Sequence, residues 1–321
     1  MLFRSGLKRI RAGRACPGIL ALLKTAGRDL ARVSTYDLGF VVGPRLNAAG
    51  RIEDMALGIE CLLATDDALA RQLAQKLDEM NRSSREVEAE MHEAALDALT
   101  DFEPQESFSI CLFNQDWHQG VIGILASRLK EKFHRPVIVF APGSDGLTKG
   151  SGRSIHGLHL RDALDMVSKR QPGLLLRFGG HAMAAGLTLE AARVAEFERV
   201  FEAVVNELLT LADLERVIET DGEISAADIG LPLACALEDA VWGQGFAAPA
   251  FVGEFRVAAQ RVVGERHLKL TLERDGCNFE AMLFFHNEAL PEKISAVYQL
   301  GVNEYNGQQT AQLTLRHWLA L

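Results

Sequence analysis

Residues 66–101 read DDALARQLAQKLDEMNRSSREVEAEMHEAALDALTD and contain neither glycine nor proline. Ala, Leu, Glu, Arg, Gln and Met dominate this stretch, and these residues favour the α-helix. Thr65 and Asp66 are good N-terminal caps, so we predict one continuous helix of about nine turns. It carries a single apolar stripe, and residues 79–90 are mostly charged or polar. Such a helix typically connects two domains.

The sequence on either side of this helix has a different pattern. Residues 18–32 and 52–64 are predicted to form short helices, and the stretch from Gly39 to Gly50 is expected to break the pattern between them. Downstream of the long helix, strand patterns alternate with helix patterns. The expected strands are residues 108–113, 136–140, 149–155 and 182–189, and the expected helices are residues 121–133, 160–168 and 191–211. This alternation predicts a three-layer α/β domain with a mixed sheet.

The last third of the chain contains short β-type runs separated by turn residues, with little helix. The runs are residues 251–263, 268–272, 279–285, 296–303 and 310–318. Five such strands in about 70 residues predict a small barrel such as an OB fold. The expected fold class is therefore α/β plus β: a long connecting helix, a mixed-sheet α/β domain and a small OB-like barrel.

The charge of the chain is unevenly distributed. The formal net charge of −9 has the wrong sign for a simple nucleic-acid-binding protein. Residues 1–51, however, carry ten Lys and Arg against two Asp, a local charge of +8, and the remainder carries −17. A basic face on an acidic body holds a polyanion locally, but a solvated basic helix face explains the same pattern.

Composition also bears on location. The five cysteines are dispersed and form no CxxC pair, which indicates reduced thiols in a cytoplasm and argues against disulfides or a zinc knuckle. No apolar run approaches the roughly 18 residues that a membrane helix needs, and the start of the chain has no signal-peptide pattern. We therefore expect a cytoplasmic protein without a membrane partner.

A first short motif, Gly150-Ser-Gly-Arg-Ser154, has the composition of a phosphate site. Its small residues, Gly152 among them, would let backbone amides approach an anion closely. Ser151 and Ser154 add hydroxyl donors, and Arg153 adds a planar guanidinium that matches phosphate oxygens. A plain surface turn has the same composition, so the motif alone leaves both interpretations open.

A second motif is Arg177-Phe-Gly-Gly-His181. Gly179 and Gly180 permit a positive φ angle and would present the imidazole of His181 from a sharp turn. A histidine so placed donates to a phosphate or orients a water molecule, although a structural histidine explains it equally well.

A third motif, Asp116-Trp-His-Gln-Gly-Val-Ile-Gly123, falls between an expected strand and an expected helix. Ligands of open α/β sheets bind beyond the carboxyl ends of strands, where the first amides of a helix receive phosphates. His118 would face that crevice, unless the loop serves only to start the helix.

A fourth motif is Gly43-Pro-Arg-Leu-Asn-Ala-Ala-Gly-Arg51. Arg45, Asn47 and Arg51 would form a cationic patch rich in hydrogen-bond donors around a tight turn. A structural role for the asparagine and the glycines is equally compatible with the motif.

Metal-ligand patterns are missing from the sequence. His156 and His159 have metal-like spacing, but no third ligand accompanies them. Walker A, GxSxG and HExxH motifs are absent, and no cluster of Asp residues suits a two-metal phosphodiesterase. We expect no metal ligands in this chain.

Together the four motifs resemble the RecJ branch of the DHH phosphoesterase superfamily. Two further runs fit the same family, Trp242-Gly-Gln-Gly-Phe-Ala-Ala-Pro-Ala-Phe251 and Asn303-Glu-Tyr-Asn-Gly followed by Gln312-Leu. The resemblance covers essentially the whole chain, and the motifs are specific jointly although each is weak alone.

The resemblance implies an exonuclease of DNA recombination and repair that degrades single-stranded DNA from 5′ to 3′ and releases nucleotides. In that family a DHH domain holds two Mn²⁺ or Mg²⁺ ions, a DHH-associated domain closes the cleft, and an OB domain guides the strand. Arg153 and His181 match the positions that hold the phosphate at the reaction centre. Ser151, Ser154 and His118 are weaker candidates. Single-strand-binding protein is an expected partner.

The same resemblance implies domain bounds. Residues 1–64 would be the end of a DHH domain, 65–100 the connecting helix, 101–212 the DHH-associated domain and 213–321 the OB-like domain. The Asp-His-His motif is absent, so the metal ligands are expected on a region that this sequence lacks. We therefore expect the chain alone to bind single-stranded DNA without cleaving it.

Two other functions stay open: a single-stranded nucleic-acid-binding module without catalysis, and a DHH-family oligonucleotide or cyclic-dinucleotide phosphodiesterase. The latter enzymes generally lack the C-terminal barrel, so residues 250–321 argue against them. Candidates for strand binding by the barrel combine basic groups with aromatic rings. They are Arg266, His267, Lys269, Phe284, Phe285 and Tyr305. If Phe284 and Phe285 alternate faces along a strand, they cannot both contact the nucleic acid.

Overall fold

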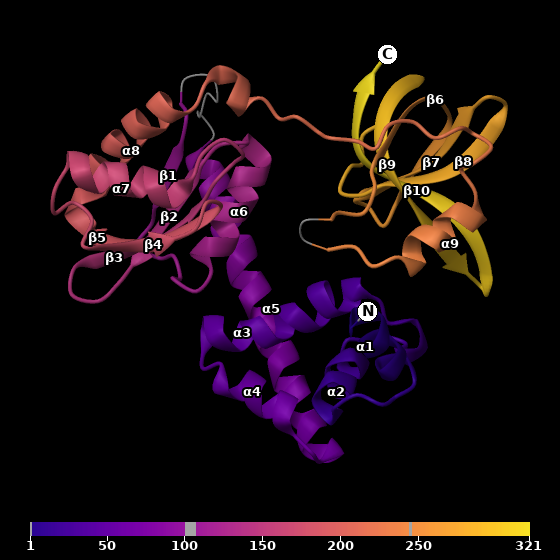
Figure 1. Ribbon diagram of the computed structural model, residues 1–321, viewed down its shortest axis with the longest axis horizontal. Helices are drawn as coiled ribbons and strands as arrows, with labels where there is room; N and C mark the ends of the chain where they lie inside the picture. Colours follow the sequence, from indigo (N-terminus) through magenta and orange to yellow (C-terminus); the bar gives the residue numbers. More distant parts are fainter. Residues whose placement is uncertain (1, 100–106, 244–245) are drawn as a thin grey trace. The chain divides into compact units, whose positions relative to one another are not determined.

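The computed structural model describes residues 2–99, 107–243 and 246–321. Two compact units are present, one of residues 5–216 and one made mainly of residues 217–321. The first contains a helical region, the long helix and an α/β domain, and the second contains a β-barrel (Figure 1). The fold class expected from the sequence is confirmed. In the described part of the chain, no helix has both the length and the apolar character needed to cross a membrane.

The long helix is α5 (Asp67–Ala98), and it begins where the sequence predicts. The carboxylate of Asp66 caps it by accepting a hydrogen bond from the amide three residues on, at 2.8 Å. The first half of α5 packs into the helical core through Leu77, and the second half packs against the α/β domain through Met91. The expected last turn, residues 100–101, lies outside the described residues.

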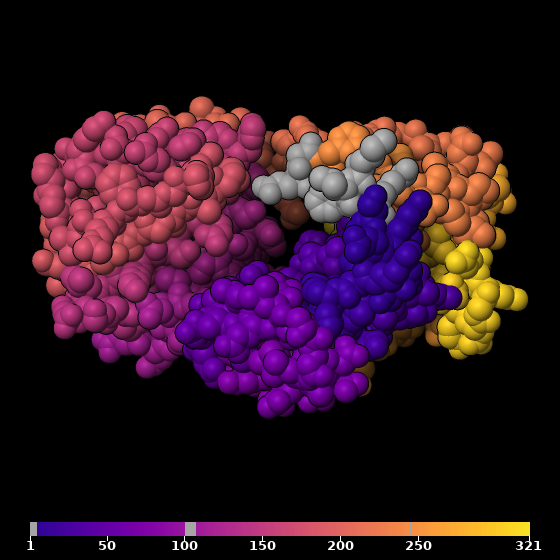
Figure 2. All heavy atoms as spheres, turned by 60° about the horizontal axis from the view of Figure 1, so that its bottom comes forward, coloured from indigo at the N-terminus to yellow at the C-terminus, as the bar shows by residue number. Residues whose placement is uncertain are grey.

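The region before α5 is more helical than expected. Its elements are α1 (Leu2–Arg11), α2 (Pro17–Thr25), η1 (Leu30–Arg32), η2 (Asp37–Val42), α3 (Gly43–Ile52) and α4 (Ala56–Leu63). The expected break from Gly39 to Gly50 is wrong, because the chain there forms a π-helical segment that continues into α3. Pro44 stands in the first turn of α3, where a missing N–H costs nothing, and Ala48 is fully buried. These helices form one packed body, indigo to violet in Figure 2.

The α/β domain is built on a mixed five-stranded sheet in the order β1-β2-β3-β5-β4. The strands are β1 (Ile110–Phe113), β2 (Val137–Pro142), β3 (Leu147–Arg153), β4 (Arg177–Gly180) and β5 (Ala184–Glu190). β1 and β2 are parallel, and the other neighbours are antiparallel. β4 is an edge strand that the sequence analysis did not predict.

Helices cover the two faces of this sheet differently. α7 (Leu160–Arg170) and α8 (Val194–Leu208) cover one face, with the short turns η3 (Ala191–Arg193) and η4 (Leu211–Leu214) on either side of α8 (Figure 1). On the other face α6 (Ile122–Phe133) packs on β2 and β3. The result is the expected three-layer arrangement, with β3 beside the start of α6.

The second unit is a closed five-stranded barrel in the order β10-β8-β7-β6-β9. The strands are β6 (Phe251–Val263), β7 (His267–Arg274), β8 (Cys277–Leu283), β9 (Lys293–Tyr305) and β10 (Gln308–Ala320). A short parallel pairing of β10 with β8 closes the barrel, and α9 (Leu231–Asp239) packs on β9 and β10. The glycine-rich turn expected within 242–251 includes residues 244 and 245, which lie outside the described residues.

Candidate phosphate-binding site and nucleic-acid-binding surface

Arg153, at the end of β3, is held in place by its neighbours. Its Nε donates a hydrogen bond to Ser127 Oγ at 3.1 Å. Its Nη1 donates to Ser151 Oγ at 3.2 Å and to the carbonyl of Gly152 at 2.8 Å. Burial lowers the pKa of Arg153 from its ordinary value, but a guanidinium stays charged throughout the physiological range. The result is a fixed, half-buried cation whose Nη2 makes none of these bonds.

The start of α6 lies directly against this arginine. A Cβ placed on Gly123 would be 3.0 Å from both Arg153 Nη2 and Ser151 Oγ, so a side chain here would crowd the guanidinium and the hydroxyl. Val121, the N-cap residue of α6, makes no side-chain hydrogen bond to the start of the helix, and none from another described residue is found. The first turn of a helix has amides without intrahelical acceptors, and these amides together with the helix dipole attract anions. An uncapped helix start, a fixed guanidinium and two serine hydroxyls therefore converge on one place.

The glycines of the first motif have a different role from the one predicted. β3 has neighbours on both sides, so its amides are used in the sheet and do not face an anion. Gly152 makes room on the opposite face, where a Cβ would be 2.6 Å from Ile138 Cδ1 and 2.8 Å from Leu160 Cδ2. Its effect on the site is indirect, because it lets β3 pack closely against Ile138 and Leu160 on the face opposite Ser151 and Arg153. A direct contact of Gly152 with phosphate stays a prediction.

The third and fourth motifs meet beside α6. A Cβ on Gly120 would be 2.2 Å from the carbonyl oxygen of Arg51, so the loop before α6 rests on the end of α3. His118 is exposed in this loop, and its Nδ1 accepts the amide of Gly120 at 3.1 Å, which places the proton of a neutral ring on Nε2. Asn47 and Arg51 are one turn apart on α3, and no hydrogen bond or ion pair of either side chain is found among the described residues.

Arg45 differs from its neighbours in the fourth motif. The tight turn expected there is wrong, because the motif is the helix α3. Arg45 Nε and Nη2 both lie 2.8 Å from Asp78 Oδ1, and Nη1 donates to the carbonyl of Val41 at 2.8 Å. Only 4% of the Asp78 side chain and 13% of the Arg45 side chain are exposed. The guanidinium of Arg45 is thus used inside the fold, and a contact with DNA stays a prediction.

His181 lies in the loop between β4 and β5. Gly180 has φ +151°, and a Cβ there would be 2.4 Å from the carbonyl oxygen of Ala184, so this position requires glycine. Gly179 has no positive φ and open space above it. The amide of His181 donates to Ala184 at 2.8 Å, and Ala184 pairs with Arg153. The loop therefore lies at the same end of the sheet as Arg153, with the imidazole exposed.

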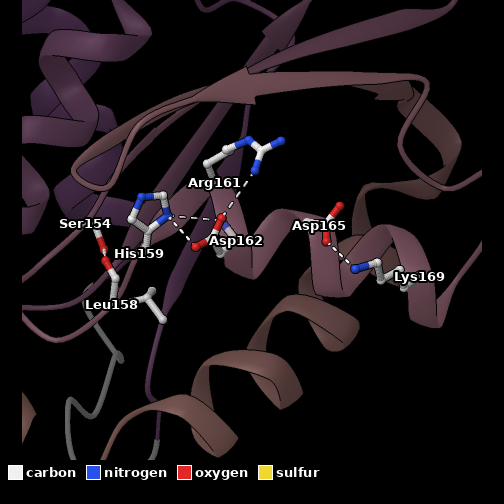
Figure 3. A network of polar contacts seen from close by, with 7 residues as sticks. All are labelled: Ser154, Leu158, His159, Arg161, Asp162, Asp165 and Lys169. Atoms are coloured by element: carbon white, nitrogen blue, oxygen red, sulfur yellow. Dashed lines mark hydrogen bonds and ion pairs between the residues drawn. The ribbon is translucent and has the colours of Figure 1, made fainter.

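Two residues near the site have structural partners, as Figure 3 shows. Ser154 is 1% exposed, and its Oγ donates to the carbonyl of Leu158 at 2.8 Å. His159 stands at the N-cap of α7, with its Nδ1 3.1 Å from Asp162 Oδ2. Ser154 therefore supports the turn after β3, and its contact with phosphate stays a prediction.

The barrel carries an exposed aromatic cluster. Phe284 and Phe285 do not alternate along a strand, because β8 ends at Leu283 and Phe285 has φ +57°. Both rings contact His267, at 5.2 Å between ring centroids. Phe285 is 84% exposed and Phe284 46% exposed. The backbone conformation thus leaves two aromatic rings in solvent.

A groove on the barrel surface adjoins this cluster and has a volume of about 640 Å³. Its lining includes the aromatic rings of Phe284 and Tyr305, the basic side chains of Lys269 and Arg261, and six other residues. Lys269 pairs with Glu280 at 3.1 Å. Arg266, another candidate, is exposed in the turn before β7. Basic groups beside exposed rings suit single-stranded nucleic acid.

Sequence reasoning missed some residues of the site. Ser127 lies one helical turn after Gly123 and donates to its carbonyl at 3.0 Å while accepting from Arg153. The spacing of four residues on α6 was a visible signal, because residues so spaced share a helix face. Lys149 lies two residues before Ser151 on β3. Residues with this spacing point to the same face of a strand, and the sequence alone shows the spacing. The sequence analysis gave neither residue a role.

Comparison with known proteins identifies the relatives of this chain and two of its domains. The model of the DHHA1 domain matches residues 106–207, and the model of the RecJ OB domain matches residues 220–317. The single-stranded-DNA-specific exonuclease RecJ of Dickeya dadantii is 47% identical over 99% of this chain and 57% of its own length. The Escherichia coli enzyme of the same name is 44% identical over 97% of this chain and 56% of its own length.

A crystal structure of RecJ from Thermus thermophilus in complex with Mn²⁺ superposes on the whole chain. The TM-score is 0.83, the sequence identity is 27%, and the chain covers 46% of that structure. This chain spans a little over half of the length of the Dickeya dadantii and Escherichia coli relatives. The chain is a homologue of the RecJ exonucleases and contains their DHHA1 and OB domains.

Proposed function

We propose that this chain is the phosphate-holding and DNA-holding part of a RecJ-type exonuclease that degrades single-stranded DNA from 5′ to 3′. The observation that carries the proposal is the convergence of Arg153, Ser151 and the uncapped start of α6 at one place. A terminal phosphate there would accept hydrogen bonds from Nη2 of Arg153 and from the first amides of α6. Holding the terminal phosphate would position the phosphodiester that follows it for hydrolysis.

The other site residues fit supporting roles in this proposal. Arg51 and Asn47 on α3 would donate hydrogen bonds to the DNA phosphates. His118, in the loop before α6, would donate from its Nε2–H. His181, at the same end of the sheet as Arg153, would approach the phosphate from the opposite side. The exposed rings of the barrel would stack on bases of single-stranded DNA. An interaction with single-strand-binding protein is part of the proposal.

Hydrolysis of a phosphodiester in this class needs metal ions to supply the attacking hydroxide. The superposed RecJ structures contain Mn²⁺ or Mg²⁺. Within residues 2–99, 107–243 and 246–321, no three His, Cys, Asp or Glu side chains are grouped so that they could hold such an ion. The described residues therefore do not fit a metal centre, and the chain alone is expected to bind single-stranded DNA without cleaving it.

The proposal is tested by incubating the purified chain with 5′-labelled single-stranded DNA and Mn²⁺. We expect a band shift without release of labelled nucleotides. Release that persists through further purification would show that the chain supplies its own catalytic centre. Absence of any binding would contradict the proposal itself.

Two other functions fit the molecule less well. An oligonucleotide or cyclic-dinucleotide phosphodiesterase has no use for a barrel with exposed aromatic rings, and residues 220–317 match the RecJ OB domain. A nucleic-acid-binding module without catalysis makes the same prediction for this chain alone. The two are distinguished by adding a DHH domain from a relative in trans, which restores cleavage only if the chain is part of a nuclease.

A further inference from the structure

Part of the sheet in the α/β domain is exposed on one face, at Arg177, Gly179 and Gly186. α6 packs on β2 and β3, and within the described residues no helix is packed closely on the same face of β5 and β4. Directly paired residues of neighbouring strands point to the same side, so the pairing shows which side chains occupy this open face. One row consists of Ser151, Gly186 and Gly179, and the next consists of Lys149, Thr188 and Arg177.

Gly179 and Gly186 form the floor of this open face, where no side chain covers the backbone. A Cβ on Gly179 would meet nothing within 4 Å, and a Cβ on Gly186 would meet only a backbone oxygen at 3.9 Å. Neither glycine has a positive φ, so neither the backbone nor internal packing requires glycine here. Gly180, Gly150 and Gly152, in contrast, would clash with neighbours if they carried side chains. Bare glycines in a strand often mark a place where another molecule comes close.

The sides of the open face are cationic. Lys149 and Arg177 are both exposed, and no ion pair or hydrogen bond of either side chain is found among the described residues. Their Cα atoms are two strand spacings apart, about 10 Å. Arg153 stands in the row on the other side of the glycine floor, paired with Ala184. The first acidic residue on this face is Glu190, one row beyond Lys149.

We propose that this open face binds the sugar–phosphate backbone of the single strand where it leaves the phosphate at Ser151. The backbone crosses Gly186 and Gly179, and Lys149 and Arg177 hold the phosphates that follow. The floor adjoins Ser151 directly through the pair with Gly186, so no gap separates the two sites. The inference rests on the proposed function, because it extends the strand from the same phosphate.

The occupant is a polyanion rather than an apolar partner, because the face offers charge and backbone but no large apolar side chain. Exposed backbone and unpaired cations recognise phosphates, so a strand with its bases turned outward suits this face. Contacts of this kind read phosphates and not bases. Binding at this face is therefore expected to depend on length and salt and not on sequence.

The test measures binding of the full chain to fluorescent oligothymidylates of two, four and eight nucleotides at several salt concentrations. The variants are the double substitution Lys149→Gln with Arg177→Gln, and Gly186→Leu, which fills the floor without changing charge. Arg199→Gln is the control, because Arg199 is exposed on α8, on the opposite side of the sheet. Arg153→Gln reports separately on the proposed phosphate site. Circular dichroism confirms that each variant is folded.

Each phosphate contact on a single strand contributes about 0.7 to the slope of log K against log salt. We therefore expect the double variant to lower the slope by about 1.4 for the four- and eight-nucleotide strands and to lose affinity for them. The dinucleotide should be affected least. Gly186→Leu should weaken binding with an unchanged slope.

A double variant that binds all lengths like Arg199→Gln overturns the inference. Loss of binding in Arg153→Gln alongside that result would leave the proposed function standing. If Arg153→Gln also matches the control, the proposed function fails as well, so the two failures are distinguishable. Should Gly186→Leu not fold, the surface double variant still decides the question.

Discussion

The partly buried arginines of residues 5–216 and the aromatic rings of the barrel are presented in opposite ways. In residues 5–216, Arg153 is half-buried and donates three hydrogen bonds, and Arg45 forms an ion pair with the buried carboxylate of Asp78. In the barrel, Phe285 and Tyr305 are 84% and 74% exposed. A side chain fixed before binding loses little entropy when its ligand arrives, whereas an exposed ring stacks on any flat surface. The first arrangement suits one phosphate at a defined place, and the second suits the face of any base.

The largest expected effect tests the difference in burial. Asp78→Ala leaves the guanidinium of Arg45 buried without its carboxylate, and breaking such a pair costs about 3–5 kcal/mol. We expect a loss of that size in the free energy of unfolding of residues 5–216, measured by chemical denaturation. Glu280→Ala breaks the more exposed pair with Lys269 in the barrel, where the expected loss is below about 1 kcal/mol. Equal losses of unfolding free energy in Asp78→Ala and Glu280→Ala would contradict the difference in burial between the two ion pairs.

The next effect tests the packing under the phosphate site. Gly152→Val would place side-chain atoms against Ile138 and Leu160, and overpacking of this kind costs about 1–3 kcal/mol. Gly186→Val adds the same atoms over open space and should leave stability nearly unchanged. Thermal unfolding of the two variants provides the comparison. Similar melting temperatures would show that the site does not depend on this packing.

A smaller effect concerns the barrel. Phe285 has φ +57°, a conformation that is strained for a bulky residue, so Phe285→Gly should not lower the melting temperature. The same change removes an exposed ring, and we expect about fivefold weaker binding of oligothymidylate, at the low end for one stacked base. Anisotropy and calorimetry on the same sample measure both quantities. A destabilised variant with full affinity would contradict the assigned role.

The smallest effect is a pH dependence confined to the first unit. Burial, and then Arg128 and Lys132, lower the pKa of His92 below its ordinary value of 6.5. The unfolded chain therefore binds the proton more readily, and stability associated with neutral His92 is lost as pH falls below about 6.5. Between pH 7.5 and 5.5 the melting temperature should fall less in His92→Gln than in the unchanged chain. An equal fall in both would exclude this contribution.

Much of the fold follows from local patterns in the sequence. The uninterrupted helix formers after Asp66 predict α5, and the alternation of strands and helices predicts the three-layer domain. The glycine and proline before Arg45 were misleading, because proline in a first turn starts a helix and does not break it. β4 was missed because Arg177-Phe-Gly-Gly has weak β propensity and is held as a strand mainly by its pairing with β5.

The site was predicted less completely than the fold, for a physical reason. Residue types that suit phosphate were visible at Ser151 and Arg153, but their partners lie far away in the chain. Ser127 reaches Arg153 across 26 residues, and Asp78 reaches Arg45 across 33. Such pairs depend on how helices pack on a sheet, which single-sequence patterns do not show. For the same reason, Arg45 and Arg51 looked alike in the sequence and differ in the structure.

The central claim is that Arg153 holds a terminal phosphate, and one binding measurement tests it most directly. Oligothymidylate with a 5′-phosphate is titrated with the unchanged chain, Arg153→Gln and the control Arg199→Gln at one salt concentration. A hydrogen bond to a charged group contributes about 1.5–3 kcal/mol, so Arg153→Gln should bind about tenfold to hundredfold more weakly than the control. The loss should shrink when the 5′-phosphate is replaced by a hydroxyl. Equal affinities of Arg153→Gln and Arg199→Gln for the phosphorylated strand would contradict the claim.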